Sequence, residues 1–160
     1  MRQGRASRNP IDRRKNFPFD PGRSRDNTAR HAQSHDRRRH REFFAIRPDD
    51  ASTAWSPVAC TAGRIDEILL VDDLDTVAAT GSRTRLARWS PGALIDRPVV
   101  HDFHEQVFVV EGDLVVGCDD RGEGGESFGP YTFACRPPGA VHGPFTSRTG
   151  CVLFEIQYYE

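Results

Sequence analysis

From residue 43 onward, apolar residues occur in short runs separated by turns that contain Gly and Pro. Short apolar runs with turn signals between them are typical of an all-β sandwich or barrel. No long segment has the 3.6-residue period of an amphipathic helix. We therefore expect an all-β fold, and the predicted strands are residues 67–71, 84–89, 97–101, 106–110, 114–118, 131–136 and 151–158.

The segment Val107-Phe108-Val109-Val110 is apolar at every position. Successive side chains of a strand point to opposite faces, so both faces of this strand would be apolar. One face can pack in the core, whereas the other needs a cover. That cover would be either the segment before Thr84 or a second copy of the chain, and a two-fold, self-complementary contact would supply it. We expect a homodimer.

Charge divides the chain into two parts. Residues 1–41 hold 12 Arg and 1 Lys against 4 Asp, whereas residues 42–160 hold 9 Arg against 19 acidic residues. The first part has few aliphatic residues, too few to offset the entropy lost on ordering. We therefore expect a disordered basic extension at 1–41 and one folded domain at 42–160. The Arg-rich run at 37–41 lacks the aromatic residues and motifs of nucleic-acid readers, so nucleic-acid binding is not expected.

Two further absences in the sequence bear on location. No stretch approaches the roughly 20 apolar residues that span a bilayer, and the N-terminus lacks the apolar region of a secretory signal. We expect a cytoplasmic protein without a membrane partner.

The four cysteines form no C-x-x-C pair, so neither a zinc ribbon nor a redox motif is indicated, and reduced, mostly buried thiols are expected.

Three histidines follow the basic segment, namely His101, His104 and His142. In an extended strand His101 and Glu105 would point to the same face, because the repeat is two residues. An imidazole and a carboxylate would then share one ion. His104 has the opposite parity, so it would point away unless a bulge turned it inward.

Two segments carry a family resemblance. The sequence Glu105-Gln106-Val107-Phe108-Val109-Val110-Glu111-Gly112, with His101 ahead of it, resembles the first motif of the cupin superfamily. Pro137-Pro138-Gly139-Ala140-Val141-His142 resembles the Pro-x-Gly-x-x-His core of the second motif. The resemblance implies a cupin double-stranded β-helix, also called a jelly-roll barrel, around a divalent metal ion.

The resemblance also implies the ligands. The metal-binding residues of the family fall on His101, Glu105 and His142, whereas the position of its first histidine holds Val99. An apolar side chain cannot bind a metal, so three ligands remain unless His104 substitutes. Two His and one carboxylate suit Fe, Zn or Mn, and they leave open coordination positions. Both the substrate and the catalytic residues stay unassigned at this point.

The chain is similar to small cupin dioxygenases and to the cupin domain of zinc-binding anti-sigma factors. The first similarity implies an enzyme that oxygenates a small carbonyl or enol molecule. The second implies a non-catalytic metal or ligand sensor. A third alternative is a degenerate cupin that keeps an apolar cup and has lost its metal.

Candidate substrate contacts lie on the predicted strand 131–136. Tyr131 and Phe133 share one face with Cys135 and would line a pocket, although ordinary core packing explains the same pattern. Either Arg88 or Arg136 would face the barrel and anchor a substrate carboxylate; the alternative is an outward, ion-paired arginine. Of these residues we expect Tyr131, Phe133 and Arg136 to contact the substrate.

Overall fold

The computed structural model describes residue 43 and residues 45–160, so the predicted extension at 1–41 lies outside the described residues. The described residues contain no helix that could cross a membrane. They form ten strands: β1 (Ser56–Val58), β2 (Ile65–Asp72), β3 (Ser82–Trp89), β4 (Ala93–Ile95), β5 (His104–Gly112), β6 (Leu114–Cys118), β7 (Gly124–Phe128), β8 (Phe133–Arg136), β9 (Phe145–Ser147) and β10 (Cys151–Tyr158).

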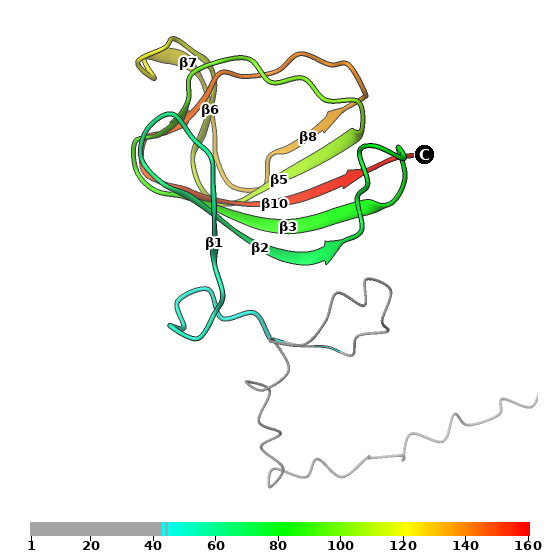
Figure 1. The fold of residues 1–160 in the computed structure, drawn as a ribbon. Coiled ribbons are helices and arrows are strands. Elements are labelled where there is room, and N and C mark those ends of the chain that lie inside the picture. Colours follow the sequence, from blue (N-terminus) through cyan, green and yellow to red (C-terminus); the bar gives the residue numbers. More distant parts are fainter. Residues whose placement is uncertain (1–42, 44) are drawn as a thin grey trace, which may run out of the picture. The chain divides into compact units, whose positions relative to one another are not determined.

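The strands build two antiparallel sheets that face each other as the walls of a barrel (Figure 1). The larger sheet has the order β1-β2-β3-β10-β5-β8, and the smaller one has the order β4-β9-β6-β7. The last strand, β10, lies between β3 and β5, so strands that are distant in the sequence are neighbours in the sheet. The all-β, jelly-roll prediction is confirmed.

Most predicted strands occur close to their expected bounds, and 151–158 and 114–118 match β10 and β6. The prediction at 97–101 is wrong. Pro98 has no amide hydrogen to donate to a ladder, and Val99 makes only an isolated bridge to His142. The short strands β1, β4, β7 and β9 were not predicted, because β1, β4 and β9 have only three residues each and β7 has a single apolar residue, Phe128.

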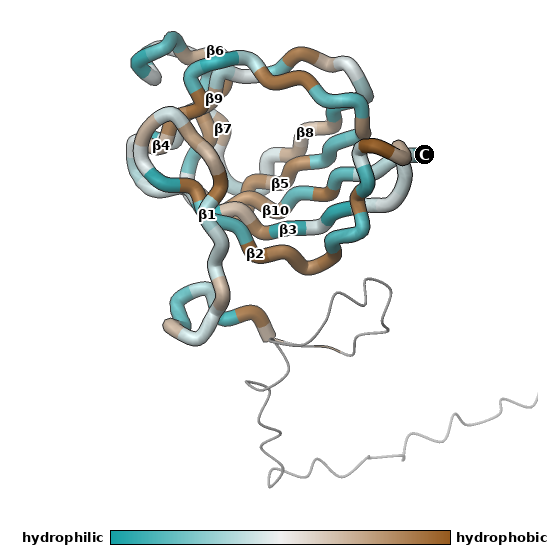
Figure 2. The backbone as a smooth tube through the Cα atoms, viewed as in Figure 1, coloured by the Kyte–Doolittle hydropathy of each residue, from teal (hydrophilic) through white to brown (hydrophobic). Residues whose placement is uncertain are grey.

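The barrel interior has an apolar part and a polar part. Along β10 every second residue is buried, first Cys151 and Leu153, then Glu155 and Gln157. The neighbouring strand β5 shows the same change, from Val109 and Val107 to Glu105. Figure 2 shows hydrophobic and hydrophilic stretches within the same strands of the larger sheet. Apolar burial at one end stabilises the barrel, and the polar end holds the candidate site.

Candidate metal centre

Three side chains from separate segments meet at the polar end of the interior. The Nε2 atoms of His101 and His142 each lie 3.6 Å from Oε2 of Glu105. One ligand atom from each residue can be chosen so that all three lie within 4.8 Å of one another. The structure thus brings together the trio that the motifs indicated.

Backbone contacts position the two histidines. The bridge between Val99 and His142 consists of two hydrogen bonds, with N–O distances of 2.8 and 3.0 Å. The amide of Gly139 also donates to the carbonyl of His101 at 2.8 Å. His101 therefore lies in a loop ahead of β5. This corrects the expectation that His101 and Glu105 share one extended strand, although the two side chains still meet.

The protonated nitrogen of each imidazole follows from its backbone partner. Nδ1 of His101 lies 2.8 Å from the carbonyl oxygen of Phe103, and Nδ1 of His142 lies 2.8 Å from that of Ala140. A carbonyl only accepts, so Nδ1 carries the hydrogen, and Nε2 of the neutral ring keeps a free lone pair. Burial lowers the pKa of His142, which favours the neutral ring. Nε2 of His101 is buried without a hydrogen-bond partner.

Glu105 is buried and ionised. Its Oε1 accepts a hydrogen bond from Nε2 of Gln157 at 3.0 Å, and its Oε2 accepts one from Arg136 at 2.6 Å. Burial tends to raise the pKa of Glu105, but the hydrogen bond from Gln157 and the charge of Arg136 outweigh it and lower that pKa. Nε2 of each imidazole therefore faces the Glu105 carboxylate.

Gln157 contributes a second unpaired atom. The Glu105 carboxylate can only accept, so the amide must turn its NH₂ group toward it and its Oε1 away. Gln157 is 5% exposed, and this Oε1 has no hydrogen-bond partner within the described residues. A buried acceptor without a donor costs about 1–3 kcal/mol.

An ion-paired group lies beside the trio on the same sheet. Arg85 contacts Glu67 at 2.8 Å and Glu155 at 2.6 Å. Burial raises the pKa of Glu155, an effect that the charge of Arg85 opposes. Counting Glu105 and Arg136, these interior groups comprise three carboxylates and two guanidinium groups.

His104 lies apart from this trio. Its Nε2 is 3.8 Å from a carboxylate oxygen of Glu160, and its ring stacks on Tyr158 with centroids 5.1 Å apart. No bulge turns it inward, so its side chain has the outward direction that its parity gives. His104 therefore does not replace the missing first histidine, whose position Val99 occupies.

Only one of the three expected substrate contacts faces the interior. Arg136 reaches Glu105, whereas Phe133 and Tyr131 are 58% and 84% exposed. The reason is register, because Ala134 and Arg136 take the inner positions of β8 and Phe133 and Cys135 the outer ones. Tyr131 precedes the strand, with φ of 67°. Tyr131 and Phe133 therefore point away from the barrel interior, and their contact with a substrate stays a prediction.

The sequence analysis missed Gln157, Glu155 and Arg85. Period-two parity could have found two of them, since Cys151 and Leu153 are apolar and Glu155 and Gln157 continue the same face. Charged and amide side chains are mostly exposed in proteins, so the sequence pattern did not assign these residues to the barrel interior.

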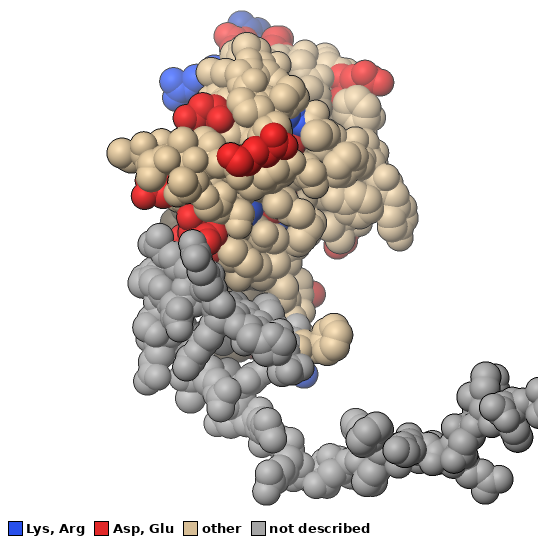
Figure 3. Space-filling model, turned by 90° about the vertical axis from the view of Figure 1, so that its right-hand side faces the viewer, with Lys and Arg blue, Asp and Glu red and all other residues tan. Residues whose placement is uncertain are grey.

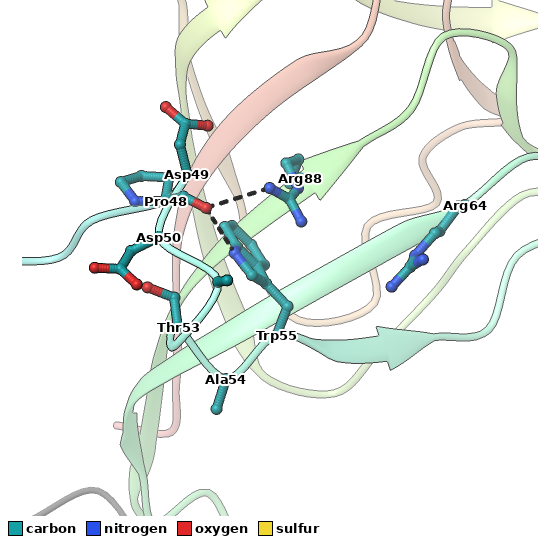
Figure 4. A pocket seen from close by; sticks show the side chains of 9 residues that line it. Pro48, Asp49, Asp50, Thr53, Ala54, Trp55, Arg64 and Arg88 are labelled. Carbon is teal, nitrogen blue, oxygen red and sulfur yellow. Dashed lines mark hydrogen bonds between the residues drawn. The ribbon is translucent and has the colours of Figure 1, made fainter. Parts of the chain in front are cut away.

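A hollow of about 500 Å³ lies elsewhere, on the outside of the sheet (Figure 4). The guanidinium of Arg88 lies 4.0 Å from the ring centroid of Trp55, and the indole donates to the carbonyl of Pro48 at 3.1 Å. Arg88 therefore faces outward. None of the three candidate ligands lines this hollow.

Comparisons with known proteins rest on structure alone. No family model matches the sequence, and no curated protein matches it. The fold is similar to that of an acetylacetone dioxygenase from Acinetobacter johnsonii, with 18% identity, 79% of each chain covered and a TM-score of 0.55. An RmlC-like cupin from Shewanella frigidimarina is also similar, with 18% identity, 75% of this chain and 93% of that chain covered, and a TM-score of 0.52.

A third similar structure is a predicted oxalate decarboxylase from Thermotoga maritima. Its identity is 10%, the match covers 73% of this chain and 100% of that chain, and the TM-score is 0.53. At such identities the likeness concerns the architecture of the two sheets.

Proposed function

Because the chain has the cupin fold, we propose that it binds one divalent metal ion through His101, Glu105 and His142 and acts as a dioxygenase-type enzyme on a small carbonyl or enol molecule. One observation carries the proposal. Two imidazole Nε2 atoms and an ionised carboxylate oxygen face one another, and Nε2 of His101 is buried without a hydrogen-bond partner. In a neutral ring Nε2 offers a lone pair that a metal ion would accept.

The donor set fits such an ion. Ligand atoms that lie about 2.0–2.2 Å from a common metal are about 3–3.5 Å apart. The imidazole nitrogens lie 3.6 Å from Oε2, and all three ligand atoms lie within 4.8 Å of one another, so the side chains would have to close around the ion to reach this range. Two imidazoles and one carboxylate suit Fe, Mn or Zn. When bound, the metal supplies Lewis acidity toward a substrate oxygen at its open positions.

The interior charges support an enol-type substrate. The ion pair of Glu105 and Arg136 carries no net charge, so a divalent ion beside it leaves an excess of positive charge. An enolate would reduce that excess. Arg136 holds the Glu105 carboxylate in place, and the buried walls exclude water from the reacting groups. The similar acetylacetone dioxygenase agrees with this substrate class.

The surface gives less support to a nucleic-acid partner. On the face that Figure 3 shows, acidic side chains outnumber basic ones over the described residues. A basic stripe is the electrostatic feature that phosphate backbones require.

Elemental analysis of the purified full chain, followed by oxygen uptake with a β-dicarbonyl compound, tests the proposal. We expect about one iron or manganese ion per chain and oxygen consumption that depends on the substrate. Zinc without turnover would instead support the sensor function. A chain that binds neither iron, manganese nor zinc would overturn the proposal and support the degenerate cupin that has lost its metal.

A further inference from the structure

A row of polar side chains crosses the inner face of the larger sheet beside the candidate ligands. Cross-strand pairing places Arg83 next to Gln157 and Gln157 next to Glu105, and Asp72 pairs with Arg83 on the other side. Directly paired residues lie on the same face of a sheet, and Gln157 and Glu105 are buried. Arg83 therefore belongs to the inner face, two strands away from Glu105.

Exposure along β3 shows where this interior meets solvent. Ala87, Arg85 and Arg83 alternate on the inner face. Ala87 is 1% exposed, whereas the side chains of Arg85 and Arg83 are 18% and 33% exposed. The Asp72 side chain, which pairs with Arg83, is 34% exposed. A molecule that enters the barrel from this end therefore meets Arg83.

The guanidinium of Arg83 is only partly engaged. Its Nε donates a hydrogen bond to Oδ1 of Asp72 at 3.2 Å, and this is its one hydrogen bond to a described residue. The two terminal nitrogens carry the remaining N–H groups. Together they form an edge that can bind a carboxylate through two parallel hydrogen bonds. Asp72 thus orients the guanidinium and leaves that edge to a ligand.

Two other arginines of the inner face have structural partners. Arg85 contacts two carboxylates, at 2.8 and 2.6 Å, and Arg136 holds the buried Glu105. A buried carboxylate that loses its arginine is left as an unpaired charge. Asp72, by contrast, keeps its contact with water. Arg83 can therefore turn to a ligand without uncovering a buried charge.

Gln157 lies between Arg83 and the candidate ligands and lacks a hydrogen-bond donor. Its NH₂ group donates to Glu105 at 3.0 Å, and its Oε1 is buried without a partner within the described residues. Only an N–H or O–H group can satisfy this oxygen. An enol hydroxyl supplies such a group, whereas a ketone carbonyl does not.

From this row we propose that Arg83 binds the carboxylate of a small enol acid whose hydroxyl donates to Oε1 of Gln157. The assignment rests on the proposed function, because it concerns the molecule on which the metal site would act. Neighbouring strands lie about 4.8 Å apart, so the backbones at Arg83 and Glu105 are about 10 Å apart. A small molecule spans the space between two such side chains. Its carboxylate also reduces the excess of positive charge that the metal ion brings.

Calorimetric titration of the metal-loaded full chain, in the absence of oxygen, tests the assignment to Arg83. The probes are acetopyruvate, which carries a carboxylate beside its enol, and its methyl ester, which lacks that charge. We expect the wild type to bind acetopyruvate at least about tenfold more tightly than the ester. Arg83→Met should reduce this preference to less than about twofold, and Arg83→Lys should retain part of it because the positive charge remains.

Arg121→Met is the matched control. Arg121 is an exposed arginine in the turn between β6 and β7, so this variant should keep the full preference for acetopyruvate. A wild type that binds both probes equally, or binds neither, would overturn the proposal. So would a folded, metal-loaded Arg83→Met protein that still prefers acetopyruvate.

The contact with Gln157 has its own variant. At saturating metal Gln157→Leu should weaken both probes by the same factor, because acid and ester share the enol. Unchanged affinity for both probes would show that the hydroxyl does not meet Gln157. A lost preference for the acid would place the carboxylate at Gln157 and refute the assignment to Arg83.

Oxygen uptake separates this assignment from the proposed function. A chain that prefers acetopyruvate through Arg83 but consumes no oxygen would exclude the dioxygenase and keep the carboxylate contact. A chain that consumes oxygen equally well with the acid and the ester, and binds them equally, would keep the dioxygenase and exclude the carboxylate contact.

Discussion

Arg136 lies directly opposite Glu105 in the β5–β8 pair and donates a hydrogen bond to its Oε2 at 2.6 Å. This oxygen is also the one that faces both imidazole nitrogens at 3.6 Å. A permanent cation and the proposed metal therefore share one carboxylate. Arg136 keeps Glu105 ionised and aimed before any ion arrives.

Removal of Arg136 should destabilise the metal-free protein. Arg136→Met leaves the Glu105 carboxylate buried without its charged partner, and breaking a buried pair in this way costs about 3–5 kcal/mol. Denaturant unfolding of the metal-free variant and the metal-free wild type measures this difference in the free energy of unfolding. The double variant Arg136→Met with Glu105→Gln should recover most of the loss, and a loss that is unchanged would mean that Arg136 stabilises the fold by packing alone.

Metal binding should separate the three histidines. His101→Ala and His142→Ala each remove one lone pair from the site, so we expect metal content below about a tenth of the wild type. His104→Ala is the matched control and should retain full occupancy, because His104 contacts Glu160 and Tyr158 outside the barrel. Elemental analysis after dialysis gives the answer, and a metal-free His104→Ala protein would contradict the three-ligand arrangement.

Gln157 should act through Glu105. Gln157→Leu removes the donor to Oε1, and loss of such a supporting hydrogen bond typically lowers metal affinity about 10- to 100-fold. Competition with a chromophoric chelator measures the affinity. Gln106→Leu changes the same side chain on the opposite face of the adjacent strand and should have no effect. Equal affinities for Gln157→Leu and the wild type would show that Glu105 needs no such support.

Acid stability should depend on the turn at Asp113, between β5 and β6. Its carboxylate accepts hydrogen bonds from the amides of Thr149 and Arg148 at 2.8 and 3.2 Å. Burial acts to raise the pKa of Asp113, but the hydrogen bonds, chiefly those from Thr149, hold that pKa below its usual value. These bonds join the β5–β6 turn to the β9–β10 turn.

The sign of the pH effect follows from that direction. The folded pKa of Asp113 lies below the unfolded value of about 3.9, so its stabilisation is complete above the unfolded pKa and is lost as pH falls through the folded one. Urea unfolding at pH 7 and at pH 3 should therefore show a smaller wild-type advantage over Asp113→Asn at pH 3. An advantage that is the same at both pH values would rule out this role for Asp113.

Much of the barrel and all three members of the trio could be predicted from the sequence, for identifiable reasons. Residues 151–158 could be predicted as a strand because they form a mostly apolar run directly after the turn residue Gly150, and the second motif places His142 near Glu105. The prediction failed where backbone chemistry overrides pattern, as at Pro98. The inward face of residues 133–136 could not be predicted either, because the alternation of side chains along a strand does not distinguish its two faces.

Gln157 and Arg85 show what a sequence pattern leaves out. Each is a polar residue in a strand, a feature that usually means contact with water. Their partners are distant in sequence, since Gln157 meets Glu105 and Arg85 meets Glu155. Only the pairing of β10 with both β3 and β5 brings these groups together.

The bridge between Val99 and His142 fastens two imidazole-bearing segments by main-chain atoms, with no contribution from an ion. The metal-free site would thus retain its shape, and metal binding would require no refolding. Under such conditions one ion can be exchanged for another in the intact barrel. Cellular supply, following the usual ranking of divalent ions for nitrogen and oxygen donors, would then govern which element the protein carries.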